Sequence, residues 1–264
     1  MGKFGFSDET IASWQDDEKF FLGKKDIAVV IFHGWSGFPR QMGLLGEVLN
    51  EKGYSVYLPR LTGHGRTPEE LETAKMDNWI SDCQKAFDFA KKKFKTEKIF
   101  AIGFSLGGNL ALISSQSIPW MGVVSIGSPM KIKNDFWARL AAQITSWFNL
   151  YFKKRYPKGA DLTNCCYSYQ YFPAKSARES FRVITKSRKT LSLVQVPLLI
   201  MQAKADYLSS ADSPDIIQRG VASNVKLIRW MNSDNQSHLI SRERVDDYVF
   251  SIDNFIKLVL RKKQ

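Results

Sequence analysis

The fold predicted for this chain depends on residues 99–108, which read Ile99-Phe100-Ala101-Ile102-Gly103-Phe104-Ser105-Leu106-Gly107-Gly108. The first four residues form an apolar run typical of a buried strand, and residues 109–116, which follow the stretch, are typical of a helix. Between them, residues 103–107 match G-x-S-x-G, in which a serine occupies a strained turn between a strand and a helix. Glycine is needed two residues on either side because a β-carbon would clash with that turn. The flanking strand and helix make this short pattern specific, so it predicts that Ser105 is a nucleophile rather than part of a structural turn.

Strands and helices alternate on both sides of this stretch. Apolar runs predict strands at residues 19–22, 27–32, 54–58, 122–126, 197–202 and 225–230. Apolar residues at helical spacing predict one helix that begins at Pro39 and is stopped by Gly53, and others at residues 77–93, 213–219 and 242–260. This alternation indicates an α/β fold with a mainly parallel sheet flanked by helices. With 264 residues, the whole chain (1–264) is expected to be a single domain.

The alternation breaks between residue 130 and about residue 189, where no clean strand is evident. Large apolar residues there form a stripe at helical spacing: Trp137, Leu140, Ile144, Trp147, Phe148 and Tyr151. A connection between a strand and the next helix is usually short, so a segment of this length indicates an insertion. We interpret it as a helical cap or lid at about 130–189, whose aromatic stripe supplies apolar walls to a substrate pocket. The alternative is that the stripe is ordinary core.

Composition limits the classes of protein to which the chain can belong. Hydrophobic residues make up 44% and charged residues 24%, as in ordinary globular enzymes. No apolar run approaches the ~20 residues that cross a bilayer, and the N-terminus lacks the apolar core of a signal peptide. We therefore expect a cytoplasmic protein. The three cysteines are too few and too poorly spaced for a disulfide framework or a zinc site, so no metal site is predicted.

The net charge of +12 is the most unusual feature of the composition. Lysine and arginine cluster at Lys91-Lys92-Lys93 and at Lys153-Lys154-Arg155. Such clusters allow weak contact with an anionic membrane surface. The simpler interpretation is a well-solvated basic surface, and no nucleic-acid-binding motif accompanies the charge, so no nucleic-acid partner is predicted.

A serine nucleophile needs a base to take its proton, and the chain contains only three histidines. His33 and His64 precede Ser105, whereas His238 follows the last predicted strand. The order serine, acid, histidine is that of the α/β hydrolases, so His238 is the candidate base and an exposed loop histidine is the alternative. We interpret His33 as a brace for the loop that it opens.

The acid that orients the base is expected just after the strand at residues 197–202. Asp206 stands there, at the C-terminal end of a strand, where open α/β sheets form their sites. Asp212 and Asp215 fall at the start of the next helix, where capping explains them. Asp234 is too close to His238 along the chain to reach it easily. Asp206 is therefore the candidate acid.

Attack by serine on a carbonyl also requires donors for the oxyanion that forms. The backbone N–H of Leu106, directly after the nucleophile, is one candidate. The second should come from the loop after the strand at 27–32, and we select the backbone N–H of Trp35. Because both donors are main-chain groups, the side chain of Trp35 is not required for this role.

Together these residues resemble the bacterial carboxylesterase and monoacylglycerol lipase family of the α/β hydrolases. The resemblance covers about residues 20–260. It rests on His33-Gly34-Trp35-Ser36-Gly37, on Leu58-Pro59-Arg60-Leu61-Thr62-Gly63-His64-Gly65 and on the Ser105 stretch, with Asp206 and His238 at the expected places. Two departures are Ala205, where relatives often have a polar residue before the acid, and Asn235-Gln236-Ser237 before His238, in place of the commoner Ser-Gly.

The resemblance implies an α/β-hydrolase fold with a Ser105-His238-Asp206 triad and with the Trp35 and Leu106 amides as oxyanion hole. It implies hydrolysis of short- to medium-chain acyl esters, a small-molecule substrate and no cofactor. The alternatives are a monoacylglycerol lipase, an acyl thioesterase and a non-catalytic binding protein of the same fold. Nothing in the sequence defines the oligomeric state.

Overall fold

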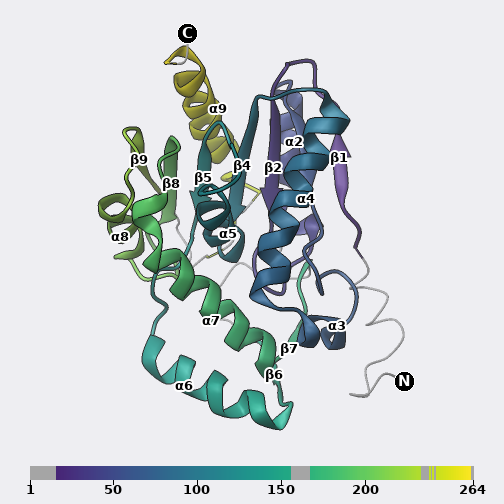
Figure 1. Ribbon diagram of the computed structural model, residues 1–264, viewed down its shortest axis with the longest axis vertical. Helices are drawn as coiled ribbons and strands as arrows, with labels where there is room; N and C mark the ends of the chain where they lie inside the picture. The colour runs from purple at the N-terminus through teal and green to yellow at the C-terminus, as the bar shows by residue number, and fades with distance from the viewer. Residues whose placement is uncertain (1–15, 156–166, 233–237, 239, 241, 263–264) are drawn as a thin grey trace.

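A computed structural model of the chain describes residues 16–155, 167–232, 238, 240 and 242–262 (Figure 1). Its centre is a seven-stranded sheet in the order β1-β3-β2-β4-β5-β8-β9. The strands are β1 (Lys19–Phe21), β2 (Ala28–Phe32), β3 (Ser55–Leu58), β4 (Ile99–Phe104), β5 (Val123–Ile126), β8 (Leu198–Ala203) and β9 (Lys226–Met231). β1 pairs antiparallel with β3, and the other neighbours pair in parallel. The predicted α/β architecture is confirmed.

Helices cover both faces of this sheet. Val30 and Phe32 of β2 belong to one buried cluster, whereas Val29 and Ile31 belong to another, as expected for a strand buried on both sides. The first cluster includes residues of α4 (Met76–Phe94), α5 (Leu106–Ser114), α7 (Ala174–Lys189) and α8 (Ser213–Gly220). The second includes residues of α2 (Gly43–Glu51) and α9 (Val245–Arg261). Burial on both faces explains why the strands read as continuous apolar runs.

Most predicted elements match the structure, and the differences are local. The helix expected from Pro39 begins as a 3₁₀ turn at Pro39–Met42, and α2 follows it. One short helix, α3 (Pro68–Thr73), was not predicted. It begins where the Thr67 side chain accepts a hydrogen bond from the Glu70 N–H at 3.3 Å. A helix of this length has too few apolar positions to show a period.

The expectation that residues 130–189 lack strands is wrong. Between β5 and β8 the chain forms α6 (Asp135–Thr145), a 3₁₀ turn at Ser146–Phe148, and a hairpin of β6 (Tyr151–Lys153) and β7 (Tyr171–Pro173) that ends at α7. These strands have three residues each, too few for a strand pattern to be recognised. Figure 1 shows α6 and the hairpin at the bottom of the molecule, where the parallel strands end.

The expectation that the aromatic stripe lines a pocket is also wrong. Trp137 is 67% exposed and Trp147 70% exposed, and four other large apolar side chains on α6 and the following turn are exposed: Phe136, Leu140, Ile144 and Phe148. α6 instead turns its small residues inward and is held on α7 by Arg139. The Arg139 guanidinium donates to the Phe181 carbonyl at 3.1 Å and to the Thr185 hydroxyl at 2.8 Å. α6 has one face of aromatic residues and another of alanines, and both faces are apolar. Periodicity alone therefore could not show which of the two packs against the rest of the protein.

No helix in the described part of the chain has the length and apolarity needed to span a bilayer.

Candidate active site

Ser105 occupies a strained turn between β4 and α5. Its backbone angles are φ 52° and ψ −114°, a conformation that a non-glycine residue rarely adopts. A β-carbon on Gly103 would collide with the Gly107 carbonyl oxygen, and one on Gly107 would collide with the Phe32 carbonyl oxygen. The expected need for glycine on both sides of the serine is therefore confirmed. The Ser105 N–H donates to the Ile126 carbonyl at 2.8 Å, which ties the turn to the end of β5.

Asp206 and His238 are in direct contact. The Asp206 Oδ2 accepts a hydrogen bond from His238 Nδ1 at 2.7 Å and another from the Gln202 amide at 3.0 Å. The Asp206 Oδ1 accepts from the backbone N–H groups of Leu208 at 2.8 Å and Ser209 at 2.9 Å. Four donors thus fix a buried carboxylate, and the proton on Nδ1 leaves Nε2 of the same ring as a proton acceptor.

Ser105 and His238 line the same cavity. The Nε2 of His238 is buried and has no hydrogen-bond partner among the described residues, so no hydrogen bond joins it to the Ser105 hydroxyl. The ring lies near the end of β5, because a β-carbon on Gly127 would be 3.4 Å from its Cε1 atom. The Phe104 ring packs against it with centroids 4.9 Å apart. The structure therefore brings Asp206 into contact with His238, and it places His238 and Ser105 at one cavity.

The competing carboxylates are accounted for in part. Asp212 is the N-cap residue of α8, and Asp215 lies in the first turn of that helix, as expected. The Asp212 side chain makes no capping hydrogen bond, however, so the expectation that it caps the helix is wrong. Asp234 and residues 235–237, which include one of the two departures from the family, lie outside the described residues.

Two backbone amides close to Ser105 have no protein acceptor among the described residues. Leu106 is the first residue of α5, where a helix leaves its N–H groups unsatisfied. Trp35 lies in the turn that follows β2, in which Ser36 has a φ of 57°. Among the hydrogen bonds of the described residues, neither amide donates to another protein group. This arrangement agrees with the selection of Trp35 and Leu106 as oxyanion donors.

Two buried histidines hold the turn that contains Trp35. His33 Nδ1 donates to the Gly34 carbonyl at 2.9 Å, and its Nε2 accepts from the Leu61 N–H at 3.3 Å. His64 Nε2 accepts from the Ser36 N–H at 3.0 Å. Burial lowers the pKa of His33 to about 4 and lowers the pKa of His64 well below its ordinary value. Both rings are therefore neutral at neutral pH, and the interpretation of His33 as a brace agrees with these contacts.

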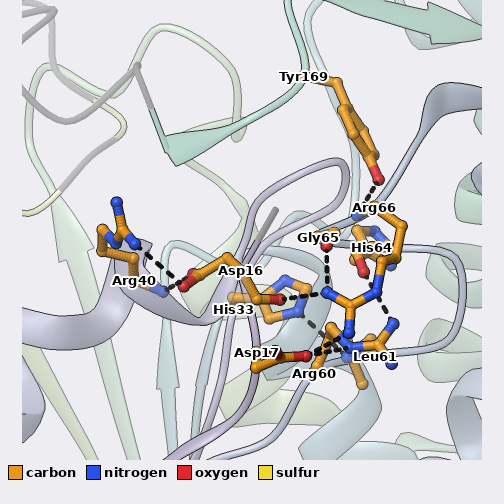
Figure 2. A network of polar contacts seen from close by, with 10 residues as sticks. All are labelled: Asp16, Asp17, His33, Arg40, Arg60, Leu61, His64, Gly65, Arg66 and Tyr169. Atoms are coloured by element: carbon orange, nitrogen blue, oxygen red, sulfur yellow. Dashed lines mark hydrogen bonds and ion pairs between the residues drawn. The ribbon is translucent and has the colours of Figure 1, made fainter. Parts of the chain in front are cut away.

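An outer network surrounds these histidines (Figure 2). The Asp16 carboxylate accepts from the Arg40 N–H at 2.6 Å, and Asp17 forms an ion pair with Arg66. The Tyr169 hydroxyl accepts from the Arg66 N–H at 2.9 Å, which joins the segment before β7 to the loop after β3. No sequence pattern identified these residues, because their partners are distant along the chain.

Two cavities meet at Ser105. The first has a volume of about 350 Å³ and is almost entirely apolar, with walls from α6 and α7 that include Ala138, Ala141, Ala142, Thr145, Ala177 and Phe181. The second, of about 390 Å³, contains His238. Ser105, Trp35, Phe172 and Leu208 line both. Alanines 138, 141 and 142 are at helical spacing, so the sequence did carry a signal for this wall beside the aromatic stripe.

The side chain of Trp35 has a role that the sequence did not indicate. Its indole N–H donates to the Ser176 hydroxyl at 3.3 Å, and its ring meets the Phe172 ring edge-on with centroids 4.8 Å apart. Both residues line both cavities, as Ser105 does.

Solved structures with the same architecture are numerous. A structure of the metagenome-derived lipolytic enzymes LipS and LipT superposes with a TM-score of 0.80 at 22% identity, covering 91% of this chain and 97% of that chain. The monoacylglycerol lipase of Paleococcus ferrophilus superposes with a TM-score of 0.74 at 20% identity, covering 91% of this chain and 98% of that chain. At these identities the likeness concerns the fold, and it confirms the expected α/β-hydrolase fold.

Sequence comparison gives the family. The Carboxylesterase of Bacillus subtilis (strain 168) is 26% identical over 224 residues, which cover 85% of this chain and 89% of that protein. The Thermostable monoacylglycerol lipase of Bacillus sp. (strain H-257) is 30% identical over 223 residues, which cover 82% of this chain and 85% of that protein. The family described as "Serine aminopeptidase, S33" matches residues 23–244, and the chain therefore belongs to this family of serine hydrolases.

Proposed function

We propose that the protein hydrolyses carboxylic esters, with Ser105 as nucleophile, His238 as base and Asp206 as the acid that orients the base. One observation carries the proposal: His238 is fixed by Asp206 through Nδ1, its Nε2 has no hydrogen-bond partner among the described residues, and His238 and Ser105 line the same cavity. Similarity to a carboxylesterase and to a monoacylglycerol lipase supports it.

The proposed reaction has two halves. The Ser105 hydroxyl attacks the acyl carbonyl while His238 Nε2 takes its proton, and the amides of Trp35 and Leu106 stabilise the oxyanion. His238 then protonates the leaving alcohol, and the acyl group remains on Ser105. A water that gives its proton to His238 attacks this acyl-enzyme, and the acid leaves as Ser105 regains its proton. Asp206 stabilises the imidazolium formed in each half.

The cavities favour an ester over a peptide that begins with a free amino group. An aminopeptidase must bind the ammonium group of its substrate, for which a carboxylate is the natural partner. None of the described residues lining either cavity is acidic. We propose instead that the apolar cavity binds an acyl chain of short to medium length, beneath a cap formed by about residues 130–189.

The direct test compares p-nitrophenyl esters from acetate to palmitate, 1-monoacylglycerols and an acyl thioester, for wild type and Ser105→Ala. Ester hydrolysis that peaks at short or middle chains and is lost in the variant supports the proposal. A strong preference for monoacylglycerols favours the lipase alternative, and one for the thioester favours a thioesterase. If wild type hydrolyses none of them and a fluorophosphonate probe does not label Ser105, the binding-protein alternative replaces the proposal.

We further propose that the exposed aromatic face of α6 contacts an anionic membrane surface. A contiguous group of exposed large apolar side chains is unusual on a soluble domain, and tryptophan is favoured at the membrane interface. Lys131 and Lys133, next to this face, are exposed, and the chain carries a net charge of +12. Apolar area and positive charge together bind anionic lipid.

Vesicle sedimentation tests this contact. We expect binding to vesicles that contain phosphatidylglycerol and little binding to phosphatidylcholine alone. Replacing Trp137 and Trp147 by serine should weaken binding roughly tenfold or more, since each large apolar side chain contributes about 1.5–3 kcal/mol when buried. Phe250→Ser is the control, because Phe250 is 64% exposed on α9, far from the cap. Equal binding of the double variant and wild type would exclude this surface.

We also propose a cytoplasmic location, which agrees with the presence of only three cysteines in the sequence and which cell fractionation tests.

A further inference from the structure

The second cavity at Ser105 has three cationic residues in its lining. Lys153, Lys154 and Arg155, which lie at the end of β6, are among its lining residues. Among the described residues, the other polar side chains that line it, apart from Ser105 and His238, are neutral: Ser36, Gln41, Ser168 and Tyr207. The apolar cavity has no charged residue among those described. The two cavities therefore differ in charge as well as in polarity.

The hairpin determines where these cations lie. Phe152 of β6 is opposite Phe172 of β7, and their rings are 5.9 Å apart. The Lys154 N–H donates to the Gln170 carbonyl at 2.8 Å, so the pairing continues beyond β6. Because side chains alternate along a strand, Lys154 is on the same face as Phe152 and Phe172. Phe172 lines both cavities, which places Lys154 on the cavity side.

A second observation agrees with this placement. The positive charge of Lys154 is one of the causes that lower the pKa of His64, after burial and His33. His64 holds the turn that contains Trp35 through the Ser36 N–H. Lys154 is half-buried, whereas Lys153 and Arg155 are exposed. All three cations line the cavity, and Lys154 is the least exposed of them.

We propose that this second cavity binds the alcohol part of the ester and that this part carries a negative charge, as in a monoacylated glycerol phosphate. The proposal rests on the proposed ester hydrolysis. An acyl chain is stabilised in the apolar cavity, so with the carbonyl at Ser105 the alcohol must occupy the other cavity. The reaction is unchanged: His238 donates its proton to the departing oxygen, and glycerol phosphate leaves.

Two water-soluble substrates with the same acyl group test the proposal: 1-butanoylglycerol 3-phosphate and 1-butanoylglycerol. We expect kcat/KM at low salt to be at least roughly tenfold higher for the phosphate than for the uncharged ester. A single cation about 4 Å from a negative charge strengthens binding about fivefold in water, and the effect is larger in a cavity. Lys154→Met and Arg155→Gln should each reduce this preference. Lys92→Gln is the control for net charge, because Lys92 is exposed on α4 and lines none of the cavities at Ser105.

Hydrolysis of p-nitrophenyl butyrate separates this inference from the proposed function. If Ser105→Ala abolishes that activity but wild type hydrolyses both butanoylglycerols equally, the cationic subsite is wrong and the esterase remains. If Lys154→Met fails to fold, Arg155→Gln and competitive inhibition by glycerol 3-phosphate still test the subsite. Inhibition by glycerol 3-phosphate that exceeds inhibition by inorganic phosphate, and that weakens in Arg155→Gln, supports it. Inhibition that the variant leaves unchanged overturns it.

Discussion

His238 Nδ1 lies 2.7 Å from Asp206 Oδ2, and the opposite nitrogen of the same ring is buried, with no hydrogen-bond partner in the described part of the chain. Asparagine has nearly the shape of aspartate, so Asp206→Asn removes the negative charge from this pair with little steric change. Replacing Asp206 by asparagine should lower kcat for p-nitrophenyl butyrate by roughly 10³–10⁴, because the imidazole loses both its orientation and the charge that stabilises its protonated form. KM should change little.

Asp212→Asn is the matched control for this prediction. Asp212 follows Asp206 in the same connection, and its side chain makes no capping hydrogen bond. Its replacement should leave kcat within about twofold, as expected for a surface group without a partner. An Asp206→Asn variant that retains wild-type kcat would show that another group orients His238.

Gln202 is expected to act as a positioning residue. Its amide donates to the same Asp206 oxygen that accepts from His238, at 3.0 Å, and the side chain is buried. Gln202→Leu should lower kcat about tenfold, corresponding to loss of one hydrogen bond of about 1.4 kcal/mol to a charged group. KM and the midpoint of thermal unfolding are the companion measurements. A fall in thermal stability without a fall in kcat would make Gln202 a structural residue only.

The two buried histidines predict a loss of stability in acid. In the folded chain the pKa of His33 is lowered to about 4 and that of His64 is lowered well below its ordinary value of 6.5. Below the ordinary histidine pKa, the unfolded state therefore binds protons that the folded state does not. The free energy of unfolding should fall as pH decreases from about 6.5 to about 4, by as much as about 1.4 kcal/mol per pH unit for each histidine.

Urea unfolding at several pH values measures this dependence. His33→Gln should be less stable than wild type at neutral pH, since its buried contacts are altered, but its stability should depend less steeply on pH. Lys92→Gln, which changes an exposed charge, should retain the wild-type slope. If His33→Gln and wild type have the same slope, His33 is not the group that takes up the proton.

The parts of the site that follow local rules could be predicted from the sequence. Ser105 was identified because its turn needs glycine at fixed positions and a strand and a helix on either side. Asp206 follows β8 as Ser105 follows β4, and the C-terminal ends of parallel strands lie at one edge of the sheet. His238 followed from the order of the three groups along the chain.

The parts that depend on contacts between distant segments could not be predicted. The apolar pattern of α6 is compatible with either face turned inward, and Arg139 reaching Phe181 and Thr185 of α7 decides between them. The contacts of Asp16 with Arg40 and of Tyr169 with Arg66 join pairs that no periodicity relates. The hairpin of β6 and β7 is too short to have a pattern, so the cationic cavity could not be located.

The inward face of α6 should set the acyl length that the enzyme accepts. Ala142 is buried and lines the apolar cavity of about 350 Å³ beside Ala138 and Thr145. Ala142→Phe adds a ring to this wall, so the space for an acyl chain becomes shorter. We expect kcat/KM for p-nitrophenyl decanoate to fall roughly tenfold or more, since each methylene excluded from an apolar site loses about 0.8 kcal/mol. The acetate ester should be hydrolysed at nearly the wild-type rate.

Gln143→Phe provides the matched control, because Gln143 is the next residue of the same helix and does not line this cavity. Gln143→Phe adds the same ring outside the cavity, so kcat/KM should depend on acyl length as it does in wild type. Overpacking in Ala142→Phe could displace α6, and the two esters distinguish this outcome. A displaced helix would alter both rates, whereas a shortened cavity alters only the longer ester. Unchanged decanoate hydrolysis in Ala142→Phe would show that the acyl chain does not bind in the apolar cavity. The acyl chain would then occupy the second cavity, and the alcohol part the apolar one.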